Sequence, residues 1–248
     1  GAIENSISFP GGTLPGVITA GAAQTMVNIH RVLPGKKILM IGTGNVGLIV
    51  SYQLMQAGAD IVGIIEAAPS VGGYAVHANK LRRAGVPFYL SHTITAARGN
   101  KKVERAVIAP VDSNYRPLNE DAFEIEVDTV CLAVGLSPLV ELASFANCRL
   151  TSLPALGGFV PVHTQSMRAG ADVYIAGDVA GVEEASTALE EGRLAGTAVA
   201  ISLGYIMPSR GEVETREIQM RIAKLRSGPF GEKRAQAKKI LCEMEASR

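Results

Sequence analysis

The fold is decided by residues 36–66, which read KKILMIGTGNVGLIVSYQLMQAGADIVGIIE. The apolar run Ile38–Ile41 is too short for most helices and leads into glycine, so it predicts a buried strand. Residues at helical spacing then extend to Ala57, and Gly58 is placed to end that helix. A second apolar run, Ile61–Ile65, predicts a second strand that ends on an acid. Strand, glycine turn, helix and strand in this order are typical of the βαβ unit that binds dinucleotides.

The turn after the first strand carries glycines at G-x-G-x-x-G spacing. The first allows a tight turn, the second lets a pyrophosphate approach the backbone, and the third lets the helix pack on the sheet. The N–H groups that begin the helix have no partner within it, and the helix dipole adds partial positive charge, so both attract phosphate. We therefore predict a dinucleotide site formed by Gly42, Thr43, Gly44, Asn45, Val46 and Gly47.

An acidic residue, Glu66, ends the second strand 19 positions after Gly47. At this place a carboxylate can accept hydrogen bonds from both hydroxyls of a ribose. It would also repel a 2′-phosphate, and no Arg or Lys follows before Lys80. The sequence therefore favours NAD over NADP. The alternative is a glycine turn in an unrelated α/β sheet, which would bind no nucleotide.

Composition narrows the classes of protein to which the chain could belong. Its 248 residues suffice for one large or two small domains. A net charge of +1 and the absence of Trp argue against a nucleic-acid surface, and no apolar run reaches the length of a membrane span. The three cysteines and four histidines show no metal-ligand spacing. An odd number of cysteines also argues against a disulfide framework, so we expect a reducing, cytoplasmic setting.

The segment that follows the βαβ unit extends it. A helix is predicted over Tyr74–Ala84, where a glycine follows as a stop, and a strand over Val86–Leu90. The resulting βαβαβ order is one mononucleotide-binding half of a doubly wound sheet. Two extended runs, Val103–Val111 and Ala122–Val127, predict an antiparallel insertion. Asp128–Val134 is expected to return as a buried strand, with its cysteine as a buried thiol rather than a redox nucleophile.

The C-terminal part of the chain has weaker patterns. Leu139–Phe145 is a candidate for a short helix, and Leu156–Val162 for a loop and an edge strand. Asp172–Asp178 predicts a short strand that ends in Gly-Asp, followed by a helix over Glu183–Leu203 with acids in its first turn. The tail from residue 209 carries charges of both signs at helical spacing, which predicts a solvated packing arm.

Three segments together resemble those of a known family. Gly1–Glu4 looks like the tail of a first crossing between two domains, Ala133–Pro138 resembles the second crossing, and Tyr174–Asp178 resembles a returning Gly-Asp strand. The chain thereby resembles the pyridine nucleotide–disulfide oxidoreductases, in which an NAD(P) domain interrupts a flavin domain. Within that family, TLPGVITAGAAQTMVNIHRVLPGKK and GDVAGVEEASTALEEGRLAG are most similar to the α subunits of sarcosine oxidase, opine or proline dehydrogenase and hydrogen cyanide synthase.

The resemblance implies an architecture. We expect an α/β fold with a three-layer, doubly wound, Rossmann-like NAD(P)-binding domain that carries an antiparallel β insertion, plus the C-terminal part of an FAD-binding domain. The expected boundaries are 1–35 for a connector from the FAD domain, 36–135 for the NAD-binding domain, 136–207 for the returning part of the FAD domain, and 208–248 for a charged helical tail.

The resemblance also implies cofactor contacts. Asp178 would accept hydrogen bonds from the ribityl chain of FAD, and the helix that begins near Val182 would aim its N-terminus at the pyrimidine edge, where reduced flavin is anionic. The alternative for Asp178 is an ordinary turn or N-cap residue. The implied NAD contacts include Ala133, Val134 and Gly135, and the implied FAD contacts are Gly1, Gly177, Asp178 and Val182.

Two features depart from the family pattern. The chain holds one dinucleotide fingerprint, whereas the family carries another, for flavin, ahead of the first crossing. We therefore expect an N-terminally truncated chain that binds FAD weakly or not at all by itself. Cysteine pairs of the C-x-x-C or C-x-x-x-x-C type are also absent, which argues against disulfide reduction.

The function that the resemblance implies is that of an oxidoreductase that uses FAD and NAD, with hydride passing between nicotinamide and flavin. It would be a subunit of a dehydrogenase or oxidase for an amine or amino acid, with a second flavoprotein subunit or a second copy of itself as partner. No catalytic residue is nominated, because none has a partner at a telling spacing. Two alternatives stay open: a non-catalytic NAD-binding module, and a one-cofactor dehydrogenase with His92 or His163 as its candidate residue.

Overall fold

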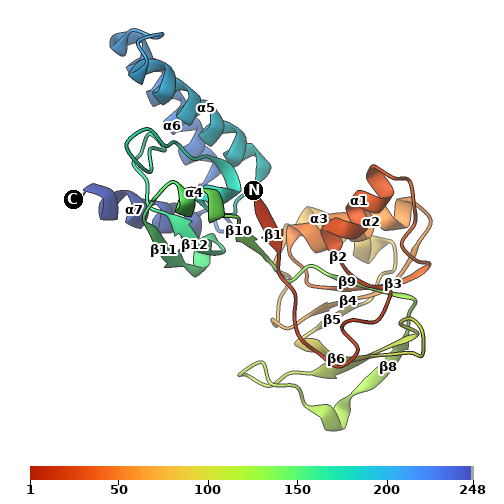
Figure 1. The fold of residues 1–248 in the computed structure, drawn as a ribbon. Coiled ribbons are helices and arrows are strands. Elements are labelled where there is room, and N and C mark those ends of the chain that lie inside the picture. Colours follow the sequence, from red (N-terminus) through yellow and green to blue (C-terminus); the bar gives the residue numbers. More distant parts are fainter. Residues whose placement is uncertain (247–248) are drawn as a thin grey trace. The chain divides into compact units, whose positions relative to one another are not determined.

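The computed structural model describes residues 1–246. The chain divides into two compact units. One comprises Glu4–Gly135, and the other comprises residues 1–3 together with the chain from Leu136 onward. Figure 1 shows the elements of both units.

A five-stranded parallel sheet forms the centre of the Glu4–Gly135 unit (Figure 1). Its strand order is β2–β9–β3–β4–β5, and every pair is parallel. The central strand β3 leads through a helix to β4 on one side and has β9 on the other, so the order reverses beside β3. The predicted α/β class with a parallel sheet is confirmed. The strands are β2 (Val17–Thr19), β3 (Lys37–Ile41), β4 (Asp60–Glu66), β5 (Phe88–Leu90) and β9 (Thr129–Leu132).

Two different layers cover this sheet (Figure 1). Side chains alternate along β3, so Ile38 and Met40 pack with the helices while Leu39 and Ile41 pack with an antiparallel sheet. The predicted antiparallel insertion is thus the third layer. The helices are α1 (Ala20–Asn28), α2 (Asn45–Gln56) and α3 (Ala75–Arg83), and the antiparallel sheet holds β6 (His92–Arg98), β7 (Arg105–Pro110) and β8 (Phe123–Glu126), with a 3-10 turn η1 (Asn119–Asp121) before β8.

The other unit is richer in helices and loops. Strands β1 and β10 pair with each other, and β11 and β12 form an antiparallel pair. Helices α5 and α6 pack against one another, and α7 packs on the 3-10 turn η2. The elements are β1 (Ala2–Glu4), β10 (Leu136–Pro138), α4 (Glu141–Phe145), β11 (Leu150–Leu153), η2 (Pro154–Leu156), β12 (Gly158–Pro161), η3 (Gly177–Ala180), α5 (Ala185–Ser202), α6 (Pro208–Leu225) and α7 (Glu232–Ala246).

The strand predicted over Asp172–Asp178 is wrong. Among the described residues this segment makes one isolated bridge, between Arg168 and Tyr174, and Gly177 then begins the turn η3. A strand needs a neighbour along its length to satisfy its backbone groups, and no strand in residues 1–246 runs beside this one. The helix that follows also starts later than predicted, at Ala185.

The tail is helical as predicted, but it is not only a solvated arm. Helix α6 buries Ile218 and Ile222, and α7 buries Leu241 and the charged Lys238. Ile218 and Ile222 belong to a hydrophobic cluster with residues of the preceding segments, such as Ile175. No helix among residues 1–246 is both long and apolar enough to cross a membrane.

Candidate functional site

The three glycines of the turn between β3 and α2 differ in whether the fold requires a glycine at that position. Gly42 has φ 108°, and a Cβ there would lie 2.2 Å from the carbonyl oxygen of Ala133. A Cβ on Gly47 would lie 2.2 Å from the carbonyl oxygen of Gly42. The fold itself therefore requires these two glycines. Gly44 has φ −62°, which any residue can adopt, and a Cβ there would meet nothing within 4 Å.

Helix α2 presents its N-terminus at the same turn. Its first intrahelical hydrogen bond is donated by the Leu48 N–H to the Gly44 carbonyl, at 3.1 Å. The N–H groups of Val46 and Gly47 precede that bond, and a helix offers such N–H groups no acceptor of its own. Together with the helix dipole, they make this end of α2 suitable for an anion such as phosphate.

The carboxylate of Glu66 is held against the glycine turn. Its Oε2 accepts hydrogen bonds from the N–H and the Oγ1 of Thr43, at 2.9 and 2.5 Å, and its Oε1 accepts one from the N–H of Ala68, at 3.0 Å. A carboxylate has about four acceptor positions. The protein therefore leaves room for one further donor, whereas two ribose hydroxyls would displace one of the existing bonds.

Two side chains of the turn anchor the segment that follows β4. Thr43, which is fully buried, accepts a hydrogen bond on Oγ1 from the Gly72 N–H, at 3.0 Å. Asn45 accepts one on Oδ1 from the Tyr74 N–H, at 2.8 Å. These polar side chains of the predicted site therefore hold backbone in place.

A cavity of about 370 Å³ lies at the carboxyl ends of β3, β4 and β9. This volume is within the range of small-molecule sites, and the place is where open parallel sheets bind their ligands. The cavity gathers some of the predicted residues and adds six others. The predicted ones in its lining are Gly42, Gly44, Glu66, Ala133 and Val134, and the added ones are Ile7, Ile41, Ile65, Ala67, His92 and Thr93.

His92 is the most notable residue that the motif does not indicate. Its Nδ1 lies 2.6 Å from the Leu90 carbonyl oxygen, which can only accept, so Nδ1 carries the proton. The ring packs against Tyr89 and Phe123. The neighbouring strands thus fix its orientation at the edge of the cavity. Gly135, by contrast, is outside the lining, and its carbonyl accepts a hydrogen bond from the Asn5 N–H at 2.9 Å.

The Gly-Asp turn lies in the other unit and is held by the protein's own groups. The Gly177 N–H donates to Oε2 of Glu191 at 3.0 Å, and the Val182 N–H donates to the Leu156 carbonyl at 3.0 Å. Either N–H group could therefore donate to a flavin only if its present hydrogen bond were broken. The Asp178 carboxylate receives no hydrogen bond from within residues 1–246, so it keeps its acceptor positions. Gly1 uses its carbonyl to accept from the N–H of Leu139, at 2.9 Å.

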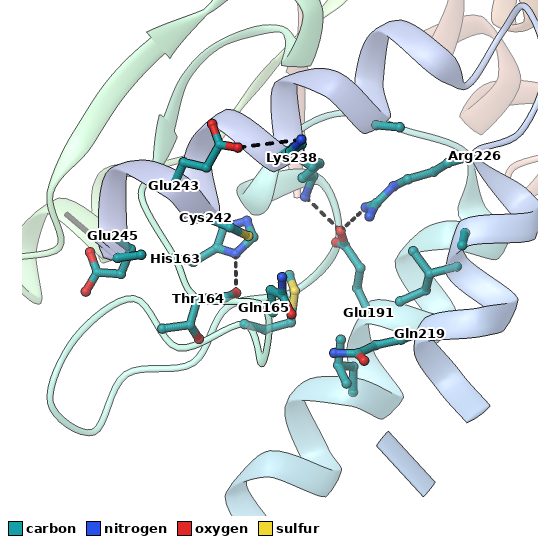
Figure 2. Close-up of a pocket in the computed structure, with 17 residues that line it drawn as sticks. His163, Thr164, Gln165, Glu191, Gln219, Arg226, Lys238, Cys242, Glu243 and Glu245 are labelled. Carbon is teal, nitrogen blue, oxygen red and sulfur yellow. Dashed lines mark hydrogen bonds and ion pairs between the residues drawn. The ribbon is translucent and has the colours of Figure 1, made fainter. Parts of the chain in front are cut away.

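Glu191 also ties this turn to the tail helices (Figure 2). Its Oε1 accepts from Nη2 of Arg226 at 2.5 Å and from Nζ of Lys238 at 2.7 Å. Arg226 makes two further hydrogen bonds to Glu183, at 2.9 and 2.6 Å. None of the four side chains is more than 14% exposed. Two acids and two bases thus form a buried cluster without net charge, hereafter the ionic cluster.

Two members of the ionic cluster, Glu191 and Arg226, have shifted pKa values. Burial raises the pKa of Glu191, but the charge and hydrogen bond of Lys238 and the charge of Arg226 outweigh it, so the pKa lies below its usual value. Burial lowers the pKa of Arg226, but the hydrogen bonds and charges of Glu183 and Glu191 outweigh that effect, so the pKa lies above its usual value. Glu191 and Arg226 are therefore ionised at neutral pH.

The cysteines and histidines form no catalytic or metal constellation within the described residues. All three cysteines are free. Cys131 is fully buried, as predicted, and burial and the charge of Glu4 raise the pKa of its thiol to about 12. His92 and His163 belong to different units. In residues 1–246 no three ligating side chains come together to hold a metal.

Comparison with known sequences gives a consistent result. A family model described as "Pyridine nucleotide-disulphide oxidoreductase" matches residues 1–192. An opine oxidase subunit from Rhizobium meliloti (strain 1021) is 32% identical over 228 residues, which cover 82% of this chain and 48% of that protein. Hydrogen cyanide synthase subunit HcnB from Pseudomonas aeruginosa is 27% identical over 236 residues, which cover 88% of this chain and 50% of that protein. The chain thus spans about half the length of these curated relatives.

Solved structures share the fold. Thioredoxin reductase from T. acidophilum matches with a TM-score of 0.66 at 20% identity, covering 80% of this chain and 62% of that one. L-Proline dehydrogenase from P. horikoshii matches with a TM-score of 0.58 at 23% identity, covering 88% of this chain and 36% of that one. The likeness supports the Rossmann-like α/β architecture seen in the sheet.

Proposed function

The chain belongs to the pyridine nucleotide-disulphide oxidoreductase family, and on that premise we propose that its Glu4–Gly135 unit binds NAD at the glycine turn. One observation carries the proposal. The open space over Gly44, the N-terminus of α2 and the Glu66 carboxylate meet at the switch point of a parallel sheet, beside a cavity of about 370 Å³.

The residues of this site fit a nicotinamide dinucleotide. A pyrophosphate needs close approach to the backbone and N–H donors, and Gly44 together with the first turn of α2 supplies both. The remaining acceptor position of Glu66 suits one ribose hydroxyl, while its charge disfavours a 2′-phosphate. Ala133 and Val134 would line the site from the end of β9, and Gly135 would act through the backbone next to them.

The fit for FAD is partial. The Asp178 carboxylate has acceptor positions for a ribityl hydroxyl of FAD. Gly1 and Val182 are the other FAD contacts that we propose. The N–H groups of Gly177 and Val182 are already bonded within the chain. We therefore propose that Asp178 is the principal flavin contact of this chain and that the chain by itself holds FAD weakly.

Homologues of the chain are named as oxidase or synthase subunits. We propose that the whole protein is a flavin-dependent oxidoreductase subunit that acts with a second subunit on an amine or amino acid, in a reducing cytoplasmic setting. When bound, nicotinamide and flavin would supply hydride transfer. This chain would contribute binding and orientation of the nucleotide, with no side chain assigned to acid–base work.

The nucleotide preference is tested by titrating NADH and NADPH separately and following nicotinamide fluorescence. NADH is expected to bind at least about tenfold more tightly, a difference of about 1.4 kcal/mol. Glu66→Ala should reduce that preference, while Glu126→Ala, an exposed acid on β8, should leave it unchanged. Tighter binding of NADPH, or an unchanged preference in Glu66→Ala, would overturn the assignment to NAD.

A second function, a nucleotide-binding module without catalysis, is favoured by the engaged N–H groups of Gly177 and Val182. Reconstitution with FAD separates the two. The flavoenzyme proposal expects the full-length protein to take up FAD and show a flavin absorption band. A full-length protein that stays colourless after reconstitution would support the module instead.

A further inference from the structure

A second and larger cavity, of about 880 Å³, lies in the unit that begins at Leu136 (Figure 2). Its wall is formed by α5, by the tail helices α6 and α7, and by the segment that contains His163 and Met167. The volume is at the upper end of the range for small-molecule sites. No residue assigned to nucleotide or flavin lines it.

His163 presents an unused acceptor in this wall. The residue is 2% exposed, and its Nδ1 lies 2.8 Å from the Thr164 carbonyl oxygen. A carbonyl can only accept, so Nδ1 carries the proton. Burial, together with the charge of Lys238, lowers the pKa of His163 to about 4. The ring is therefore neutral at pH 7, and Nε2 bears a lone pair.

Nothing in residues 1–246 donates a hydrogen bond to that lone pair. His163 Nε2 is fully buried and has no partner among the described residues. Buried acceptors of this kind are rare in folded proteins because water can no longer satisfy them. Water cannot reach Nε2 in this structure, so a ligand in the adjoining cavity would bring an N–H or O–H to it as side chains of the wall move aside.

The charged side chains around the cavity already have partners. Glu191, Arg226 and Lys238 line it, and with Glu183 they form the ionic cluster, which has no net charge. Much of the remaining wall is apolar, from Met167, Leu194 and Ile222 among others. Three more charged residues line the cavity: Lys239 and Glu243 pair with each other at 3.7 Å, and Glu245 also has a partner. A charged ligand would therefore have to displace one of these partners.

We propose that this cavity binds an uncharged, largely apolar small molecule that donates one hydrogen bond, from an N–H or O–H group, to Nε2 of His163. The proposal is independent of nucleotide binding, since the two cavities lie in different units. The tail helices then have a role as walls of a ligand site.

The test uses indole, which has one N–H on an apolar ring, and 1-methylindole, which lacks that donor. The chain contains no Trp, so indole emission can be followed without interference from the protein's own indoles. We expect saturable binding of indole with emission moving to shorter wavelengths. 1-Methylindole should bind at least about fivefold more weakly, because it leaves Nε2 unpaired. The cavity is large enough to admit the extra methyl group.

Three variants assign the site. His163→Phe keeps a ring but removes the acceptor, so it should bind the two probes equally. Ala223→Phe, on α6 in the cavity wall, should weaken both. The matched control, Val213→Phe, alters an exposed residue on the same helix outside the wall and should change neither.

The proposal fails if indole does not bind saturably, or if 1-methylindole binds the unaltered chain as tightly as indole. It also fails if Ala223→Phe binds both probes as the control does. If His163→Phe does not fold, the proposal is still tested by comparing indole with 1-methylindole on the unaltered chain and by Ala223→Phe.

Discussion

Three glycines of one motif serve the molecule for two different reasons. Gly42 and Gly47 are required by the backbone around them, whereas Gly44 faces open space. The motif predicts this division between turn, open approach and close packing. The atoms that a Cβ would meet could not be predicted, because they depend on the neighbouring strand and on the helix.

A substitution at Gly47 is therefore expected to damage the fold. The new methyl group of Gly47→Ala would meet the Gly42 carbonyl oxygen, which is backbone and cannot move aside. We predict a loss of about 2 kcal/mol or more in the free energy of unfolding, measured in urea. Gly44→Ala, its matched control, should lose no more than about 1 kcal/mol, the cost of a poorer helix cap. Equal losses in both variants would contradict this account of the turn.

His163 is expected to make stability depend on pH. Its pKa is about 4 in the folded chain, against the usual 6.5 of an exposed histidine. Above pH 6.5 the His163 ring is mostly neutral in both the folded and the unfolded chain. Between pH 6.5 and about 4, the His163 imidazole is protonated in the unfolded chain but stays neutral in the folded chain. The free energy of unfolding therefore falls as the pH falls towards 4. At about pH 4.5 the loss is about 2.5 kcal/mol relative to about pH 7.

The measurement compares urea unfolding of the unaltered chain and His163→Phe at both pH values. The variant should lack that part of the pH dependence. Lys238, Glu191 and Arg226, the charged groups that act on the ring, are present in both proteins, so the difference isolates the histidine. Identical pH profiles would show that the imidazole is not held neutral.

At the scale of elements, the strongly periodic segments were predictable and those that depend on distant partners were not. Strands β3 and β4 and helix α2 follow from apolar runs and a glycine stop. Strand β6 has small and polar residues (His92–Arg98), and its pairing with β7 decides its conformation. The strand predicted over Asp172–Asp178 fails for the same reason, since no described strand pairs along it.

The tail helices illustrate what a charge pattern leaves out. Mixed charges at helical spacing predict a solvated face, and such a face runs along most of α6 and α7. The sequence gives no sign that Arg226 and Lys238 turn inward to meet Glu183 and Glu191, since these acids lie on or just before another helix.

Arg226 should therefore be important for stability. Arg226→Met would leave two buried carboxylates with a single cation, and we predict a loss of about 3–5 kcal/mol in the free energy of unfolding. Lys239→Met, which breaks an exposed pair with Glu243 on α7, should change it by less than about 1 kcal/mol. Chemical denaturation of both variants checks this. A loss in Arg226→Met as small as in Lys239→Met would show that the ionic cluster does not hold the tail.

At the scale of the whole molecule, nucleotide binding depends on the Glu4–Gly135 unit. Its strand order brings the ends of β3, β4 and β9 to one edge. The pairing of β3 with β4 follows from the βαβ pattern in residues 36–66, whereas the place of β9 beside β3 does not. The positions of Ile7, His92 and Thr93 at that edge could not be predicted, because they come from segments without a motif. The same holds for the bonds from Thr43 that occupy part of the Glu66 carboxylate.

The most direct test of the central claim, that the glycine turn binds NAD, is a titration of NADH into the unaltered chain and into Gly44→Ala. The structure has room for this methyl group, which would stand where the pyrophosphate must approach. We predict saturable binding by the unaltered chain, and binding at least about tenfold weaker in Gly44→Ala at nearly unchanged stability. An unaltered chain that does not bind NADH, or a variant that binds it equally well, would contradict the account.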